Sequence, residues 1–128
     1  MNIIVCGAGQ VGASIARHLA DEHHDVTIID LAPELINRLS STIDVQGVVG
    51  HASHPDVLES AGAARADMLI AATHSDEVNI VACQVAHALF GVPTKVARLR
   101  TQTYLERDWR KLFGPNNLPI DLVISPEL

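Results

Sequence analysis

The sequence predicts an α/β fold in which a doubly wound parallel sheet of six strands carries helices on both faces. Short apolar runs alternate with helical patterns along the whole chain of 128 residues, which is typical of repeated strand–helix–strand units. Strands of such a sheet are buried on both faces, so they consist largely of Val, Ile, Leu and Ala. The usual order of six such strands is 3-2-1-4-5-6, with right-handed crossovers.

The expected strands are short apolar runs bounded by polar, glycine or proline turns. They span residues 2–6, 25–30, 46–49, 66–71, 94–99 and 120–124. The fourth run, Ala-Asp-Met-Leu-Ile-Ala, is nearly all apolar. This composition favours a central and fully buried position in the sheet.

The expected helices lie between these strands, at residues 10–20, 33–39, 56–61, 76–90 and 101–112. In the first helix, Val11, Ile15 and Leu19 recur every four residues and therefore share one face. Ser75 is suited to be the N-cap of the fourth helix, which Gly91 ends. The apolar face predicted for that helix consists of Val78, Val81, Ala82, Val85 and Leu89.

The composition favours a soluble globular domain without a nucleic-acid partner. Hydrophobic residues make up 48% of the chain, and its net charge of −6 disfavours a polyanion such as DNA. No apolar run approaches the roughly 20 residues that cross a bilayer, and no basic segment of a signal peptide opens the chain. Cys6 and Cys83 lie in apolar runs, as expected of buried thiols in a reducing cytoplasm.

A glycine motif follows the first strand and opens the first helix. It consists of Gly7-Ala8-Gly9-Gln10-Val11-Gly12, and Asp30 ends the next strand. This context is typical of a Rossmann dinucleotide site. Gly7 is expected to permit the tight turn, Gly9 to let a pyrophosphate approach the backbone, and Gly12 to let the helix pack closely. The helix N-terminus offers free N–H groups and partial positive charge to the phosphates.

Asp30 is expected to accept hydrogen bonds from the hydroxyl groups of the adenosine ribose. A 2′-phosphate would meet this carboxylate, and the next residues, Leu31 and Ala32, include no arginine to neutralise it. NAD or NADH is therefore favoured over NADP, while ATP and ADP keep the 2′-hydroxyl and remain alternatives. The alternative role of Asp30 is to cap the next segment.

Two further strand ends carry candidate binding residues, because ligands of open α/β sheets bind at the carboxyl ends of the strands. His51 and Ala52 follow the third strand and are expected to line the adenine. Thr73 and His74 follow the fourth strand and are expected to face the pyrophosphate or the nicotinamide ribose. For both histidines, the alternative is an ordinary polar position in a surface loop.

Arg98 and Arg100 end the fifth strand, where a guanidinium group can meet a phosphate. Ordinary salt bridges are the alternative for both. The spacing of His51 and His54 suits zinc, but no third or fourth ligand lies near them in the sequence, so no metal site is expected.

Four stretches of the sequence resemble the RCK family, also called KTN, whose members regulate potassium conductance. They span residues 3–15, 50–62, 66–84 and 96–104, and the closing segments 120–121 and 124–127 fit as well. The resemblance covers residues 1–128 and is most specific in Gly-His-Ala-Ser-His-Pro and Ala-Thr-His-Ser-Asp-Glu-Val-Asn.

This resemblance implies the N-terminal nucleotide-binding domain of a cytoplasmic gating subunit, held at the inner face of the membrane by a potassium transporter. It also implies that the ribose lies on Asp30 and that Thr73 and Arg98 lie near the phosphates. Position 51 is an aspartate in many members of the family and a histidine here. Family members carry a C-terminal lobe and a helix that pairs two copies, so we expect this chain to be a fragment of a homo-oligomeric protein.

The favoured hypothesis is a regulatory domain and not an enzyme. A dehydrogenase needs a substrate pocket and a proton donor beside the nicotinamide, but the loops are short and His74 is the one obvious acid or base at a strand end. A small NAD-dependent oxidoreductase is therefore a lesser alternative. An ATP- or ADP-sensing domain of the same type of transporter is another, and a redox sensor attached to an exporter is a third.

Overall fold

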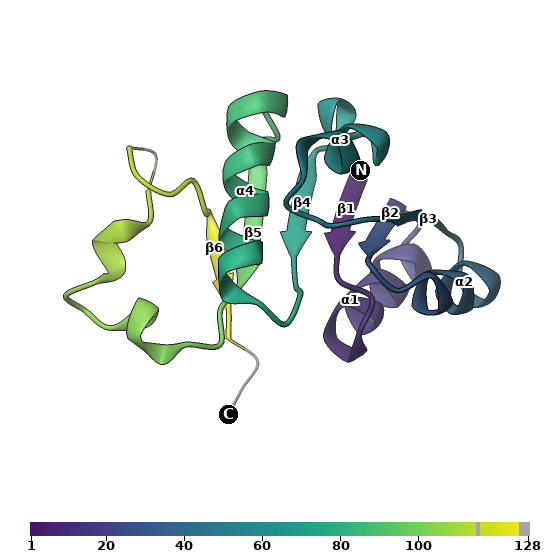
Figure 1. Cartoon of the computed structure of the whole chain (residues 1–128), viewed down its shortest axis with the longest axis horizontal. Coiled ribbons are helices and arrows are strands. Elements are labelled where there is room, and N and C mark those ends of the chain that lie inside the picture. The colour runs from purple at the N-terminus through teal and green to yellow at the C-terminus, as the bar shows by residue number, and fades with distance from the viewer. Residues whose placement is uncertain (115, 126–128) are drawn as a thin grey trace.

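Six parallel strands form one sheet in the order β3-β2-β1-β4-β5-β6, in a computed structural model that describes residues 1–114 and 116–125 (Figure 1). This order confirms the prediction, and every strand lies within two residues of its expected limits. The strands are β1 (Asn2–Cys6), β2 (Asp25–Asp30), β3 (Val45–Val49), β4 (Met68–Ala71), β5 (Thr94–Arg98) and β6 (Leu122–Ile124). Pro115, Pro126 and Glu127, which belong to a predicted loop and to the matching C-terminal segment, lie outside the described residues.

Four helices cover the sheet, two on each face. They are α1 (Gln10–Asp21), α2 (Pro33–Thr42), α3 (Pro55–Ser60) and α4 (Asp76–Phe90). One buried cluster joins α1 and α2 to one face, and a second joins α3 and α4 to the other. Proline in the first turn of α2 and of α3 is favourable, because that position needs no backbone N–H donor.

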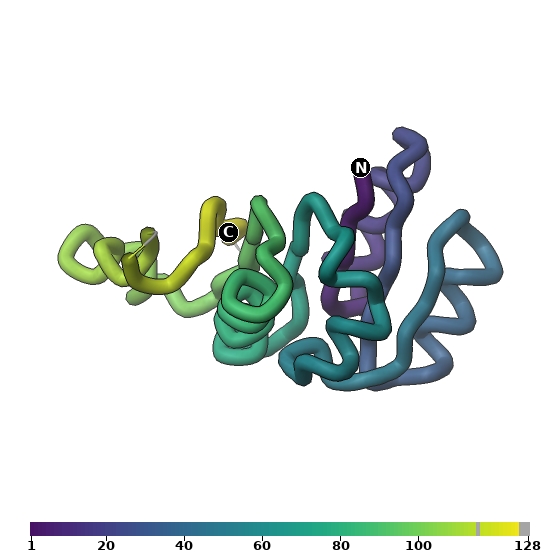
Figure 2. Tube along the Cα trace, turned by 90° about the horizontal axis from the view of Figure 1, so that it is seen from above, coloured from purple at the N-terminus to yellow at the C-terminus, as the bar shows by residue number. Residues whose placement is uncertain are grey.

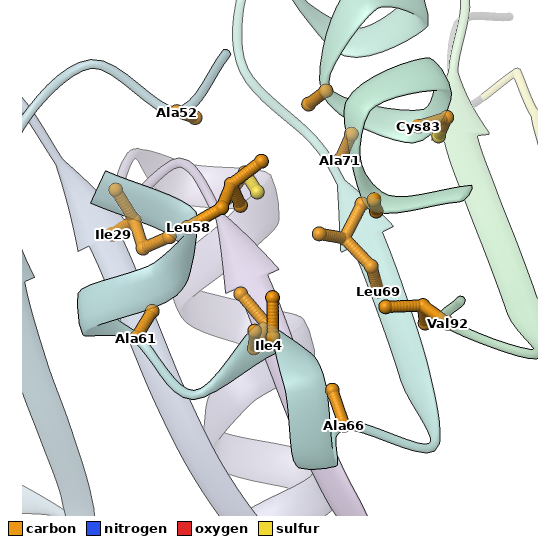
Figure 3. Close-up of a cluster of buried hydrophobic side chains, with 14 of the residues drawn as sticks. Ile4, Ile29, Ala52, Leu58, Ala61, Ala66, Leu69, Ala71, Cys83 and Val92 are labelled. Carbon is orange, nitrogen blue, oxygen red and sulfur yellow. The ribbon is translucent and has the colours of Figure 1, made fainter. Parts of the chain in front are cut away.

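The central strand β1 supplies both clusters, because successive side chains of a strand point to opposite faces. Ile3 and Val5 pack on the side of α1 and α2, whereas Ile4 and Cys6 pack on the side of α3 and α4. Figure 3 shows Ile4 of β1 together with Leu58 of α3 in the second cluster. A sheet filled from both faces in this way holds its central strands rigidly.

The connections reverse direction between β1 and β4. From β1 the chain proceeds through β2 to β3, then returns to pair β4 with the free side of β1. Cys6 is paired with both Ile29 of β2 and Ala71 of β4, so the three strands end at one level. Ligands of open α/β sheets bind at this kind of switch point.

The prediction of a helix at residues 101–112 is wrong. The segment contains only two short 3-10 turns, Gln102–Leu105 and Arg110–Leu112, and extends beyond the β6 edge in both views (Figures 1 and 2). Tyr104 and Leu105 are half-buried, whereas most of the other side chains in the segment are exposed. A helix gains most of its stability from packing an apolar face, and this segment buries no such face, since Trp109 and Leu112 are exposed.

The prediction of which residues form the buried face of α4 is also partly wrong. Val81 and Leu89 are 46% and 62% exposed, while Asn79, Cys83 and Ala86 face the sheet. The helix is apolar on nearly every side, so periodicity alone does not identify the buried face. Small side chains occupy that face because they let α4 pack closely on β4 and β5.

Both cysteines are buried and free, as predicted. Burial raises the pKa of the Cys83 thiol to about 12. Burial, and secondarily the neighbouring Cys83, raises the pKa of Cys6 above the usual range. Neither thiol therefore forms the reactive thiolate near neutral pH. None of the helices in the described part of the chain combines the length and apolar character needed to cross a bilayer.

We predict effects of very different size for two leucine truncations that the sequence pattern alone would not separate. Leu58→Ala removes a fully buried side chain and should lower the free energy of unfolding by about 2–5 kcal/mol. Leu89→Ala, on the exposed face of α4, should change it by less than about 0.5 kcal/mol. Urea denaturation measures both values, and a large loss for Leu89→Ala would contradict the observed orientation of α4.

Candidate functional site

The glycine loop turns sharply after β1 because Gly7 has a φ of 104°. A Cβ atom at Gly7 would lie 2.7 Å from the carbonyl oxygen of Ala72, so the loop also touches the end of β4. At Gly12 a Cβ atom would lie 1.7 Å from the Gly7 carbonyl oxygen. The tight turn predicted at Gly7 and the close helix approach predicted at Gly12 are therefore confirmed.

Gly9 differs from the other two glycines of the motif. Its φ of −73° suits any residue, and the nearest atom to an added Cβ would be His74 Nε2, at 3.5 Å. Gly9 is the N-cap of α1 and provides no side-chain hydrogen bond to the amides of the first turn. These amides remain available to an anion, and the missing Cβ leaves the approach to them open.

Asp30 holds the glycine loop in place. Its Oδ2 accepts a hydrogen bond from the Ala8 amide at 2.7 Å, and its Oδ1 accepts one from the Ala32 amide at 2.9 Å. The capping role considered for Asp30 is therefore present. An ionised carboxylate has about four acceptor positions, so each oxygen keeps one for a further donor.

Two adjoining cavities lie at the carboxyl ends of the strands. One has a volume of about 230 Å³ and the other of about 240 Å³, and Asp30, Thr73 and His74 line both. The first is completed by the candidates Gly7, Gly9, Gln10, Val11 and Arg98, and the second by the candidates His51 and Ala52. Ala8 and Gly12 line neither cavity and shape the loop from behind.

Asn79 is a buried residue that the sequence analysis missed. Its Oδ1 accepts hydrogen bonds from the Thr73 amide at 2.9 Å and from the Thr73 hydroxyl at 2.6 Å. Its Nδ2 donates to the carbonyl oxygens of Thr73 and Arg98, at 3.2 Å and 2.8 Å. One side chain of α4 thus joins the ends of β4 and β5, and all four of its hydrogen-bonding positions are used.

Asp76, also missed, ties the first turn of α4 to the segment after β5. Its two carboxylate oxygens accept hydrogen bonds from the amides of Arg100 and Thr101, both at 2.8 Å. Burial opposes ionisation, but these bonds, one from the Thr101 side chain, and the Arg100 charge outweigh it and hold the pKa of Asp76 below its ordinary value. The sequence does contain a signal that could have identified these two residues: Asp76 and Asn79 are polar and lie three positions apart in a largely apolar helix.

The two arginines at the end of β5 have different positions. Arg98 lines the first cavity, where its Nη1 approaches the Thr73 carbonyl oxygen at 3.5 Å. Its Nε is buried and has no hydrogen-bond partner among the described residues. Arg100 is exposed and lines neither cavity, and its Nη1 lies 3.5 Å from the His74 carbonyl oxygen. Arg98 is therefore the better placed of the two for a phosphate.

His51 and His54 form a stacked pair at the second cavity. Their ring centroids are 4.4 Å apart, and His51 Nδ1 accepts a hydrogen bond from the Ser53 amide at 3.3 Å. Stacked rings do not converge on a common metal position. Across residues 1–114 and 116–125, no group of three or more His, Cys, Asp or Glu side chains is arranged to hold a metal ion.

Comparison with known proteins identifies the family. Residues 3–126 match the TrkA-N domain. The chain belongs to the TrkA-N family. This TrkA-N chain is 59% identical, over all of its length, to the Trk system potassium uptake protein TrkA of Azorhizobium caulinodans. It is 50% identical, over 99% of its length, to the protein of the same name from Halomonas elongata. The chain covers only 28% and 27% of these two relatives.

Solved structures share the TrkA-N fold. The TrkA-N domain of the inner membrane protein ybaL from Escherichia coli matches with a TM-score of 0.82 over 98% of this chain and 87% of that one, at 16% identity. The Kef CTD of Shewanella denitrificans in its AMP-bound form matches with a TM-score of 0.69 over 85% of this chain and 68% of that one, at 26% identity.

We predict that Asp76 stabilises the fold in a pH-dependent manner. Because folding lowers the pKa of Asp76, its contribution is present above the unfolded pKa of about 3.9 and is lost as the pH falls below it. Asp76→Asn should lower the free energy of unfolding at pH 7 by about 1–3 kcal/mol, and the difference from the wild type should shrink below about pH 4. Denaturation at pH 7 and below about pH 4 measures both free energies of unfolding, and Asp44→Asn, at an exposed position, is the control. If Asp76→Asn lost the same free energy of unfolding at both pH values, the stabilising role of the ionised Asp76 would be contradicted.

Proposed function

We propose that this TrkA-N domain binds NAD or NADH and regulates a membrane potassium uptake transporter as part of a longer cytoplasmic subunit. One observation carries the proposal of the ligand. The open amide end of α1, the Asp30 carboxylate and the Arg98 side chain belong to one cavity at the switch point of the sheet. Phosphates complement the amide end of α1 and the Arg98 guanidinium, and the hydroxyl groups of a ribose complement the Asp30 carboxylate.

The phosphates are proposed to lie against the first turn of α1. The amides of Gln10 and Val11 would donate to them past Gly9, whose missing side chain leaves room. Arg98 would supply charge from the opposite wall, and the Thr73 loop would close the site between them.

The adenosine is proposed to extend from Asp30 into the second cavity. Ile29, Leu31 and Val78 give that cavity apolar walls, and His51 and Ala52 complete it. Apolar walls suit the faces of an adenine ring, and the free acceptor positions of Asp30 suit the ribose hydroxyls. A 2′-phosphate would repel this carboxylate, so NADP is disfavoured.

ATP and ADP are the second candidate class of ligand. They present the same adenosine, and the AMP-bound form of the similar Kef CTD supports adenosine nucleotides in general. The dinucleotide is preferred because the motif Gly7-Ala8-Gly9-Gln10-Val11-Gly12, followed by Asp30 at the end of the next strand, is typical of dinucleotide sites. Direct titration distinguishes the two classes.

Regulation is proposed over catalysis because the relatives that align over the whole chain are named as potassium uptake proteins. The lesser alternative is an NAD-dependent oxidoreductase, and it requires turnover of the cofactor with a reducible substrate. In a regulator, the nucleotide would favour one arrangement of the assembled subunits, and a tenfold difference in affinity between two arrangements is worth about 1.4 kcal/mol. A transporter subunit and further copies of the protein are the proposed partners.

The first test of this proposal is calorimetric titration of the 128-residue chain with NAD, NADH, NADPH, ATP and ADP. NAD or NADH should bind most tightly, and Gly9→Val should abolish binding while the chain still folds, because φ at Gly9 suits valine. Ser14→Val adds similar bulk on an exposed position of α1 and should bind as the wild type does. Retained affinity in Gly9→Val would contradict the phosphate position, and binding of ATP and ADP alone would favour the second class.

A second test concerns the reading of the ribose by Asp30. Asp30→Ala should reduce the preference for NADH over NADPH by about tenfold, which corresponds to about 1.4 kcal/mol. The ratio of the two affinities is the informative quantity, because loosening of the loop held by Asp30 affects both ligands alike. Asp25→Ala, at the other end of β2, is the matched control. An unchanged ratio in Asp30→Ala would show that Asp30 does not contact the ribose.

A further inference from the structure

His74 lies beside the proposed path of the phosphates. Its side chain lines both cavities, and its Nε2 is 3.5 Å from the position that a Cβ atom would occupy on Gly9. Gly9 is the residue of the motif that a pyrophosphate passes most closely. The imidazole of His74 is thus within reach of a phosphate oxygen bound at the first turn of α1.

The backbone that carries His74 is fixed, whereas its ring is free. The Thr73 hydroxyl accepts a hydrogen bond from the Ser75 amide at 3.2 Å, and Asn79 holds both the amide and the hydroxyl of Thr73. Arg100 Nη1 lies 3.5 Å from the His74 carbonyl oxygen. No hydrogen bond engages the His74 ring within residues 1–114 and 116–125. The ring can therefore donate from Nε2 to a ligand without giving up a bond in the protein.

Charges of both signs surround His74. They belong to Asp30 at the end of β2, His51 after β3, Asp76 and Glu77 at the start of α4, and Arg98 and Arg100 at the end of β5. The glycine loop and the first turn of α1 carry no charged side chain. Carboxylates and guanidinium groups ordinarily keep their charge between about pH 5.5 and about pH 8.5, whereas histidine changes its charge within this interval. The histidines of the site, which are His74 and the stacked pair His51 and His54, can thus make it more positive as the pH falls.

His74 and His51 differ in their surroundings. His51 Nδ1 is engaged within the protein by Ser53, whose amide donates to it at 3.3 Å and whose hydroxyl oxygen lies 2.9 Å from it. The His74 ring has no hydrogen-bond partner in the described part of the chain and is free to turn to a ligand. It also lines the first cavity, where the open amide end of α1 lies, whereas His51 lines only the second.

We propose that His74 couples nucleotide binding to pH: its protonated imidazole donates to the ligand's phosphate, so the site binds nucleotide more tightly as the medium becomes acidic. This inference rests on the proposed function and adds a second input to the same site. The bound phosphate stabilises the charged ring, and by linkage the ring takes up a proton when the ligand binds. The regulator would thus respond to the nucleotide and to the proton concentration together.

NAD is the probe for this inference, because each phosphate of its pyrophosphate carries one ester and one anhydride linkage and has no proton that titrates near neutral pH. The terminal phosphate of ADP does titrate there, with a pKa near about 6 for such groups, and would obscure the effect. The wild-type chain should bind NAD about tenfold more tightly at about pH 5.5 than at about pH 8.5, which is the effect of raising one histidine pKa by about one unit. Titrations at pH 6.5 in two buffers of different ionisation enthalpy should show net proton uptake on binding.

His74→Gln is the decisive variant, because glutamine keeps a donor of similar reach and cannot gain a charge. It should still bind NAD, with an affinity that is flat across the pH range and with no proton uptake. His18→Gln, at an exposed position of α1 outside both cavities, is the matched control and should keep the affinity, the pH dependence and the uptake of the wild type. His51→Gln tests the adenine end of the site and should keep the pH dependence and the uptake, whatever its affinity. Because His74 is exposed, the variant should fold as the wild type does, and its unfolding midpoint checks this directly.

Three other outcomes would each contradict a different part of the proposal. A wild-type affinity that does not change with pH, or a pH dependence that survives in His74→Gln, would overturn the coupling while leaving the nucleotide site intact. Loss of the dependence in His51→Gln alone would assign it to the adenine end of the site. Absence of NAD binding to the wild type at every pH would overturn the proposed function, and this inference with it.

Discussion

The close contact between the glycine loop and its surroundings is the constraint on which the site depends. Gly12 brings the first turn of α1 against the Gly7 carbonyl, and Gly7 in turn touches the end of β4 at Ala72. A side chain at either glycine would force the helix away from the sheet. The Asp30 carboxylate then fixes the loop by accepting the Ala8 amide. The amide end of α1 is thereby aimed at the cavity before any ligand arrives, which lowers the cost of binding.

A second set of polar contacts gives the opposite wall the same rigidity. Asn79 and Asp76 lie on the buried face of α4 and bond to the backbone after β4 and after β5. A buried polar group is stable only when its hydrogen bonds are satisfied, so these side chains fix the loop conformations that satisfy them. Thr73 and Arg98, which line the first cavity, are consequently held in one unit with α4.

The sequence predicted the sheet order, the glycine turn and most of the residues that line the two cavities, because periodicity and the motif are local signals. It failed where local signals are ambiguous. Residues 101–112 contain good helix formers but bury no continuous face, and α4 is too uniformly apolar to indicate that Val81 and Leu89 point outward. The role of Asn79 depends on two strand ends that are distant in sequence, so no local pattern predicts it.

The arrangement of the two walls determines how binding could be transmitted beyond the site. A phosphate between α1 and Arg98 would add a link between two units that already lie close together at Gly7 and Thr73: the glycine loop with α1, and the Thr73–Asn79–Arg98 unit with α4. α4 presents Val81 and Leu89 on its outer side. A ligand influences such a surface only through a difference in affinity between two positions of the helix. Asn79 joins α4 to the backbone at the ends of β4 and β5, so a ligand that displaced the Arg98 backbone would act on the whole helix and not on one side chain.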